Sequence, residues 1–224
     1  MSTDWNAISA IPGPDRRRRC GWCLSAPEYI AYHDDEWGRP VTDDGRLFEK
    51  FCLEGFQSGL SWLTILRKRE GFRNAFAGFD PTRVARFGER DVERLLHDAA
   101  IVRHRGKIEA TIANARATLD VQDRCGSLAA LVWEFEPPRR ARPIPERLGD
   151  LPNVTAESTA LAKTLRRHGF RFIGPTTAYA AMESLGLVND HLKGCHVRVA
   201  CNRDRQALVV PQPAISRDNV GDRE

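Results

Sequence analysis

Cysteine and histidine side chains occur in two short clusters that lie far apart in the sequence. Cys20 and Cys23 form a CGWC motif that His33 follows, and near the other end His191 and Cys195 are four residues apart. The second spacing points both side chains to one side of a helical turn. Thiolates and imidazoles at such spacings are the ligands that a tetrahedral Zn²⁺ needs. The two clusters could therefore form one zinc site, which would tie both ends of the fold together.

Spacing alone leaves the ligand set open. A C-x₂-C pair is the familiar half of a zinc site, which favours Cys20 and Cys23 together with His191 and Cys195. The simpler alternative is that the cysteines are small buried apolar side chains and the histidines lie on the surface. A zinc site that joins residues so distant in sequence would restrict a very long loop and thereby stabilise the fold.

A carboxylate stands within the apolar stretch 52–62, CLEGFQSGLSW. Glu54 has leucine and phenylalanine close by, and Trp62 ends the stretch. An unpaired carboxylate in apolar surroundings is unfavourable, and such groups mark functional sites more often than chance. The alternative is a glutamate on the solvent edge of a helix, with Gly59 and Leu60 only separating two helices.

Aromatic residues gather close to the first cysteine cluster. They are Trp22, Tyr29, Tyr32 and Trp37. Such a cluster is either ordinary core or the wall of a pocket that stacks on a flat ligand.

The stretch 98–108, DAAIVRHRGKI, joins two helical patterns through a short connection. Its residues of interest are Arg103, His104, Arg105, Gly106 and Lys107. The start of the second helix exposes backbone N–H groups that can hold a phosphate without reading the base sequence. Short helix–helix connections with basic residues are also common without any such role.

The elements that must position these residues are helical almost throughout. Apolar side chains recur every three to four residues, and no alternating strand pattern longer than four residues is present. We predict a mostly α fold with eight to ten short helices, including helices that begin after Asp43 or Asp44, after Asp80 and at Pro175. Residues 1–19 are predicted to be a flexible basic arm, 20–201 the helical domain, and 202–224 a disordered tail.

Composition excludes several classes of protein. The 224 residues include 34 Lys and Arg against 30 Asp and Glu, a net charge of +4. We find no apolar run long enough to span a bilayer and no secretory signal, so we expect no membrane partner and a cytoplasmic protein with reduced cysteines. The mild positive charge permits nucleic-acid binding without requiring it.

Four motifs, in this order, resemble the bacterial 3-methyladenine DNA glycosylase I family of the helix-hairpin-helix glycosylase superfamily. The motifs are CGWC with EYIAYHDDEWGRPVTDD, then LFEKFCLEGFQSGLSW, then DVERLLHDAAIVRHRGKIEATIANARA, and GLVNDHLKGC. The resemblance runs from Cys20 to about Cys195. It implies a compact helix-hairpin-helix glycosylase-like fold whose N- and C-terminal regions are tethered by structural zinc. Ala100 stands where family members often have glycine.

The resemblance also implies a role for each candidate residue. It replaces the spacing-based zinc set by Cys20, His33, His191 and Cys195, with Cys23 as a nearby thiol. Glu54 is expected to accept hydrogen bonds from the flipped base, Trp62 to stack on it, and four residues to shape the pocket: Tyr32, Trp22, Trp37 and Tyr29. Gly59 and Leu60 are expected to fill the gap left in the duplex, and the hairpin to contact phosphates through Arg103, His104, Arg105, Gly106 and Lys107.

The expected function is hydrolysis of the N-glycosidic bond of 3-methyladenine in alkylated double-stranded DNA, by base flipping and without strand cleavage. The product would be free 3-methyladenine, one zinc ion per chain would be structural, and the protein would act as a monomer on nucleoid DNA. Two alternatives differ in class: a non-catalytic zinc-stapled protein that binds damaged duplex DNA, and a sensor of free modified purines.

Overall fold

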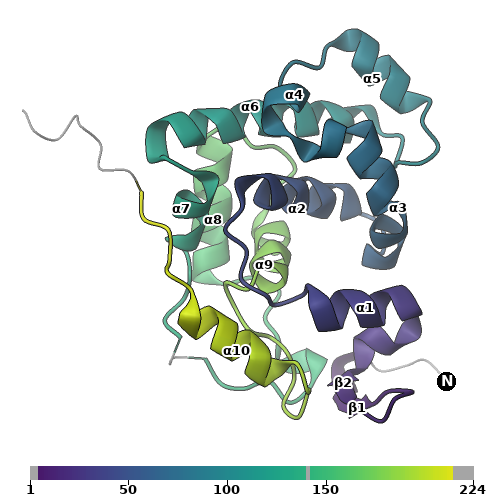
Figure 1. Ribbon diagram of the computed structural model, residues 1–224, viewed down its shortest axis with the longest axis vertical. Helices are drawn as coiled ribbons and strands as arrows, with labels where there is room; N and C mark the ends of the chain where they lie inside the picture. Colours follow the sequence, from purple (N-terminus) through teal and green to yellow (C-terminus); the bar gives the residue numbers. More distant parts are fainter. Residues whose placement is uncertain (1–4, 140–141, 214–224) are drawn as a thin grey trace, which may run out of the picture.

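The computed structural model of the chain describes residues 5–139 and 142–213. Within these ranges the protein is mostly helical, as predicted (Figure 1). The described residues form ten α-helices: α1 (Pro27–Asp35), α2 (Asp44–Gln57), α3 (Trp62–Ala75), α4 (Pro81–Val84), α5 (Glu89–Leu96), α6 (Arg105–Cys125), α7 (Leu128–Trp133), α8 (Ala156–Arg167), α9 (Pro175–Ser184) and α10 (Arg198–Ala207).

Local sequence sets several helix starts. The Asp43 carboxylate accepts a hydrogen bond from the Arg46 backbone N–H at 2.8 Å and begins α2, while Asp80 caps α4 in the same manner. Pro175 is the first residue of α9, where its missing N–H costs nothing. These three predicted starts are confirmed because each depends only on residues within one turn.

Helix α2 is the centre of the core. Its residues from Leu47 to Phe56 are almost all buried, and it contacts α3, α6, α7 and α9. The phenylalanine rings of α2 and α3 pack directly, with 4.6 Å between the centroids of Phe56 and Phe72. Burial on all sides fixes α2, which carries the glutamate singled out above.

The N-terminal segment differs from the flexible arm that we expected. Strand β1 (Ala10–Pro12) pairs antiparallel with β2 (Arg18–Cys20), after a 3₁₀ turn, η1 (Trp5–Ala7). The Arg19 guanidinium is 3% exposed and forms ion pairs with Asp15 and Asp34. A basic residue with two carboxylate partners is held inside the fold, which the charge run alone did not indicate. Residues 1–4 of the expected arm lie outside the described residues.

The C-terminal boundary also differs from the prediction. Helix α10 continues to Ala207, because Cys201 is buried and Arg205 pairs with Glu136 at 2.7 Å. The segment 214–224 of the expected tail lies outside the described residues. Figure 1 shows α10 at the same end of the molecule as β1, β2 and α1, so the N-terminal segment and the last helix lie at one end of the fold.

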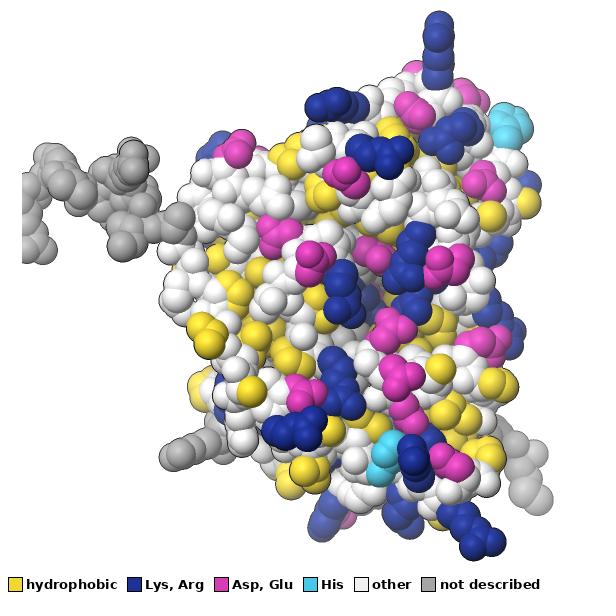
Figure 2. Space-filling model, in the orientation of Figure 1, with side chains coloured by type: hydrophobic (Ala, Val, Ile, Leu, Met, Phe, Trp, Pro, Cys, Tyr) yellow, Lys and Arg dark blue, Asp and Glu magenta, His cyan; other side chains and the backbone are white. Residues whose placement is uncertain are grey.

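The proline-rich connector near 136–153 contains only a short 3₁₀ turn, η4 (Leu148–Asp150), among its described residues. This turn contacts η1, and the Leu148 N–H donates to the Ile8 carbonyl at 2.8 Å. On the face shown in Figure 2, basic and acidic side chains are interspersed. Within the described ranges, no helix has both the length and the hydrophobicity that crossing a membrane requires.

Candidate active site and metal centre

One cavity of about 220 Å³ collects all six residues that we expected at a base-binding pocket. Its wall comes from the segment before α1, from α1, α2, α3 and α9, and from the connector. The lining residues are Trp22, Tyr29, Tyr32, Trp37, Glu54, Gln57, Trp62, Leu148, Leu151, Ala180 and Glu183. Residues separated by up to 161 positions therefore form one pocket.

Glu54 lies on the wall of this cavity and is 6% exposed. Its Oε1 atom is 2.8 Å from the ammonium of Lys50, one turn earlier on α2. Burial lowers the pKa of Lys50, and the neighbouring Glu54 carboxylate opposes this effect. The glutamate is therefore an ion-paired buried group, not the solvent-edge residue of the alternative interpretation. The sequence analysis did not identify Lys50 as the partner of Glu54, although the spacing of four residues on a helix is typical of such an ion pair.

Aromatic rings supply most of the remaining wall. The Tyr32 and Trp62 ring centroids are 5.5 Å apart, and Trp22 packs edge-on against Tyr29 and Trp37. Burial and the nearby Glu54 carboxylate hold the pKa of Tyr32 well above its usual value, which keeps the phenol neutral. A neutral aromatic wall of this kind suits a flat heteroaromatic ligand.

Several wall residues were not singled out from the sequence. Leu148 and Leu151 belong to the connector, where no periodicity indicated burial. Glu183 on α9 is a second carboxyl group in the wall, and burial together with the neighbouring Asp190 raises its pKa well above the usual range. Tertiary packing brings these residues to the pocket wall, and no local sequence pattern predicts that position.

The turn between α2 and α3 lies beside the pocket. Gly59 has a φ of +82°, a left-handed conformation that favours glycine, and Leu60 is 42% exposed. Ser61 then caps α3 by accepting from the Thr64 N–H. A hollow of about 250 Å³ beside this turn also includes Glu54 and the first turn of α9. An exposed leucine thus stands next to the buried glutamate.

The helical hairpin expected at 98–108 is present and joins α5 to α6. His104 caps α6, its Nδ1 accepting from the Lys107 N–H at 3.2 Å. Arg103 is exposed, whereas Arg105 forms ion pairs with Glu89 and Glu93 on α5. The exposed backbone at the start of α6 and Arg103 remain available to a phosphate.

Lys107 differs from its expected role at this hairpin. Its side chain is buried, and its ammonium donates to the carbonyls of Phe56 at 2.9 Å and Ser58 at 2.7 Å. The lysine therefore satisfies the free carbonyls at the end of α2 and holds the Gly59–Leu60 turn, so its charge does not point toward solvent.

The four metal-ligand candidates implied by the resemblance come together in one buried cluster. Their ligand atoms all lie within 4.8 Å of one another, from Cys20, His33, His191 and Cys195. The His191 Nδ1–His33 Nε2 distance is 3.2 Å, and Cys195 Sγ is 3.6 Å from His191 Nδ1 and 3.5 Å from His33 Nε2. Zinc–nitrogen and zinc–sulfur bonds in a regular tetrahedron place such atoms about 3.3 to 3.8 Å apart. The donor set therefore fits a tetrahedral metal ion.

Contacts outside the cluster orient its ligands. His33 Nδ1 lies 2.8 Å from an Asp34 carboxylate oxygen, and His191 Nε2 lies 3.0 Å from the Trp37 carbonyl. Such second contacts fix the ring nitrogen that faces a metal. Cys23 is also buried but is not one of the four residues, so the set favoured by spacing differs from the cluster that forms.

The fold and the pocket define the class of this protein. This helical fold, which carries an aromatic cavity, a buried carboxylate and an exposed leucine, is shared with solved DNA glycosylases. The solved structure of 3-methyladenine DNA glycosylase I from Staphylococcus aureus, which concerns 3-methyladenine recognition, superposes with a TM-score of 0.75. It is 36% identical, and the match covers 80% of this chain and 96% of that one.

Sequence comparison gives the family. The methyladenine glycosylase family matches residues 22–199. DNA-3-methyladenine glycosylase 1 of Escherichia coli is 50% identical over 177 residues, covering 79% of this chain and 95% of the relative. The DNA-3-methyladenine glycosylase of Haemophilus influenzae is 45% identical over 181 residues, covering 79% and 96%. The chain belongs to the methyladenine glycosylase family.

Proposed function

We propose that this chain removes 3-methyladenine from alkylated double-stranded DNA by hydrolysing the N-glycosidic bond. The observation that carries the proposal is the position of Glu54: a buried, ion-paired carboxylate on the wall of an aromatic cavity, next to the exposed Leu60. The relatives named above act on or recognise 3-methyladenine by their names. We also propose that the chain works as a monomer, since the pocket and the four-residue cluster are assembled without a residue of a second chain.

Recognition follows from the charge and shape of the damaged base. Methylation at the 3-position makes adenine cationic while it is attached to the sugar, so the leaving group is already activated. The Glu54 carboxylate can attract that charge and accept from the exocyclic amine, and in a water-poor cavity such attraction is strong. Stacking on Trp62 and Tyr32 adds on the order of 1–3 kcal/mol for a base. The C–N bond electrons then leave with the base, which becomes neutral, while water attacks the sugar carbon and loses one proton to the solvent.

Base flipping explains the exposed turn beside the pocket. A stacked base cannot enter a closed cavity, so the nucleotide must leave the duplex at a cost of a few kcal/mol. We infer that the exposed Leu60 occupies the vacated space and that Arg103 and the start of α6 hold the DNA backbone.

Leu60→Ala is expected to lower kcat/KM on methylated duplex DNA by about tenfold or more, because an apolar side chain no longer fills the gap. The affinity for free 3-methyladenine should stay unchanged, since Leu60 does not line the base cavity. Excision kinetics and fluorescence titration measure the two quantities. Val199→Ala, at an exposed valine of α10, is the control. Equal loss of free-base affinity would contradict the assignment.

The reaction is proposed to stop at the abasic site. Strand cleavage through a Schiff base needs a free amine, but the amines nearest the pocket are engaged: Lys50 with Glu54 and Lys107 with two carbonyls. We expect the product strand to remain intact on a denaturing gel until alkali is added, and borohydride to trap no covalent adduct. A trapped adduct would overturn this point.

The metal cluster is proposed to hold one zinc ion with a structural role. Four protein ligands leave no coordination position for water, and the site joins the N-terminal segment to the region before α10. When bound, zinc would cross-link the N-terminal segment to the region before α10. It would take no part in the reaction of the base.

The function itself is tested by chromatography of bases released from methylated duplex DNA. Release of 3-methyladenine supports the proposal. DNA binding without release would favour the non-catalytic damage-binding protein, and affinity for free modified purines without DNA binding would favour the sensor.

A further inference from the structure

One ammonium group contacts three residues of the base pocket at once. Lys50 Nζ is 2.8 Å from Glu54 Oε1 and 2.8 Å from the Tyr32 hydroxyl oxygen. It also lies 3.5 Å from the centroid of the Trp62 ring, a cation–π distance. An ammonium has three N–H donors, and here each has a partner that belongs to the pocket.

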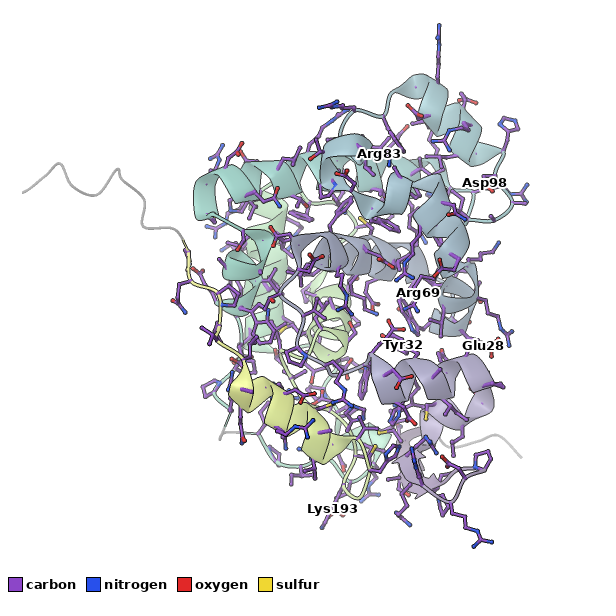
Figure 3. All side chains as sticks on the ribbon, in the orientation of Figure 1. Glu28, Tyr32, Arg69, Arg83, Asp98 and Lys193 are labelled. Carbon is purple, nitrogen blue, oxygen red and sulfur yellow. The ribbon has the colours of Figure 1, made fainter. Side chains whose placement is uncertain are left out.

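Lys50 contacts the aromatic wall without lining the base cavity. Tyr32 and Trp62 line both the base cavity and a second, smaller hollow, and only the second hollow includes Lys50. The ion pair of Arg69 with Glu36 lies at this second hollow. Figure 3 shows Tyr32 on α1 and Arg69 on α3 at the space between α1 and the helices α2 and α3. The base can therefore occupy its cavity while Lys50 stays in place.

Apart from Glu54, no part of the described core packing around Lys50 calls for a charge at this position. A lysine buried at the centre of a helix is unfavourable unless it is paired, and an apolar side chain of similar length would fill the same space. Burial indeed lowers the pKa of Lys50, with Glu36 opposing this effect and Arg69 adding to it. The contacts of the ammonium are thus with residues of the site, which points to a role there.

We propose that Lys50 is a positioning residue of the glycosylase site. It holds Oε1 of Glu54, so that Oε2, which has no hydrogen bond among the described residues, faces the base. It braces Tyr32 and Trp62, and it compensates the Glu54 charge. The direction of the Glu54 Oε2 atom and the position of the Trp62 ring then select the base. An uncompensated negative charge on Glu54 is not the sole basis of recognition. This inference rests on the proposed function and deepens it.

Three variants test the inference: Lys50→Met keeps length and removes charge, Lys50→Arg keeps charge, and Lys163→Met alters an exposed lysine of α8 as the matched control. We expect Lys50→Met to remain folded but with a lower Tm than the wild type, because Glu54 loses its buried ion-pair partner. It should bind free 3-methyladenine about tenfold more weakly and lose about tenfold to a hundredfold in kcat/KM, since a charge-assisted contact has been removed. Lys50→Arg should retain more activity than Lys50→Met.

A ligand-free measurement separates this inference from the proposed function. Tryptophan emission of Lys50→Met should differ from that of the wild type, and the difference should vanish when both proteins also carry Trp62→Phe. If the wild type releases 3-methyladenine and Lys50→Met matches it in affinity, rate and emission, the positioning role is overturned and the glycosylase proposal stands. If the wild type releases no base, the glycosylase proposal fails, whatever the emission shows.

Discussion

Glu54→Gln is expected to reduce the release of 3-methyladenine from methylated duplex DNA by about 10²–10³-fold, the usual loss when one preorganised electrostatic contact is removed. The amide cannot balance the positive charge of the methylated base. It also leaves the Lys50 ammonium, 2.8 Å away, without its carboxylate inside the fold. Both effects act on the same step, because the altered group faces the reacting nucleotide.

Excision kinetics on methylated DNA and titration of free 3-methyladenine measure this result. Glu134→Gln, at an exposed glutamate after α7, is the matched control. A thermal melt shows whether the variant remains folded, since removing one partner of a buried pair also destabilises the protein. Unchanged excision together with unchanged free-base affinity would remove Glu54 from the site and with it the proposed mechanism.

Loss of the metal cluster is expected to have the largest effect on stability. Cys195→Ser or His191→Ala removes one of four ligands, and with it a link between residues 158 positions apart such as His33 and His191. For a cross-link closing so long a loop, the loop-entropy argument gives about 5 kcal/mol. In a chain of this size that corresponds to a fall in Tm of roughly 10–20 °C.

Metal content and Tm together test this prediction. The wild type should carry one zinc ion per chain, and the ligand variants should carry none. Cys23→Ser distinguishes the two ligand sets, because it should keep the metal if His33 is the fourth ligand. Cys125→Ser, at a thiol outside the cluster, is the control. A ligand variant that keeps the wild-type Tm would show that the cluster does not tether the fold.

Chelation should act first on the ends of the chain. Strands β1 and β2 and the segment before α10 meet at the cluster, whereas α2 is buried among other helices. Limited proteolysis after chelation is therefore expected to cut near the N-terminus before it cuts within α2. Simultaneous cutting at both places would indicate that the metal supports the whole core.

Local chemistry was sufficient to predict part of this protein. Helix starts at Asp43, Asp80 and Pro175 follow from capping within one turn, and the mostly helical class follows from apolar periodicity. The resemblance of four motifs predicted the family, the pocket residues and the metal-ligand candidates. Such features are encoded by neighbouring residues or by recognisable strings of them.

Tertiary structure alone decided how those residues are used. Charge could not show that Arg19 is buried between two carboxylates, nor that Lys107 caps α2 and turns away from solvent. Spacing favoured Cys23, yet His33 reaches the cluster because α1 packs beside the segment of His191. Lys50 has three pocket partners on α1, α2 and α3. The physical reason is similar each time: at least one partner of each buried polar group comes from another element of the fold, and only the packed structure brings the two together.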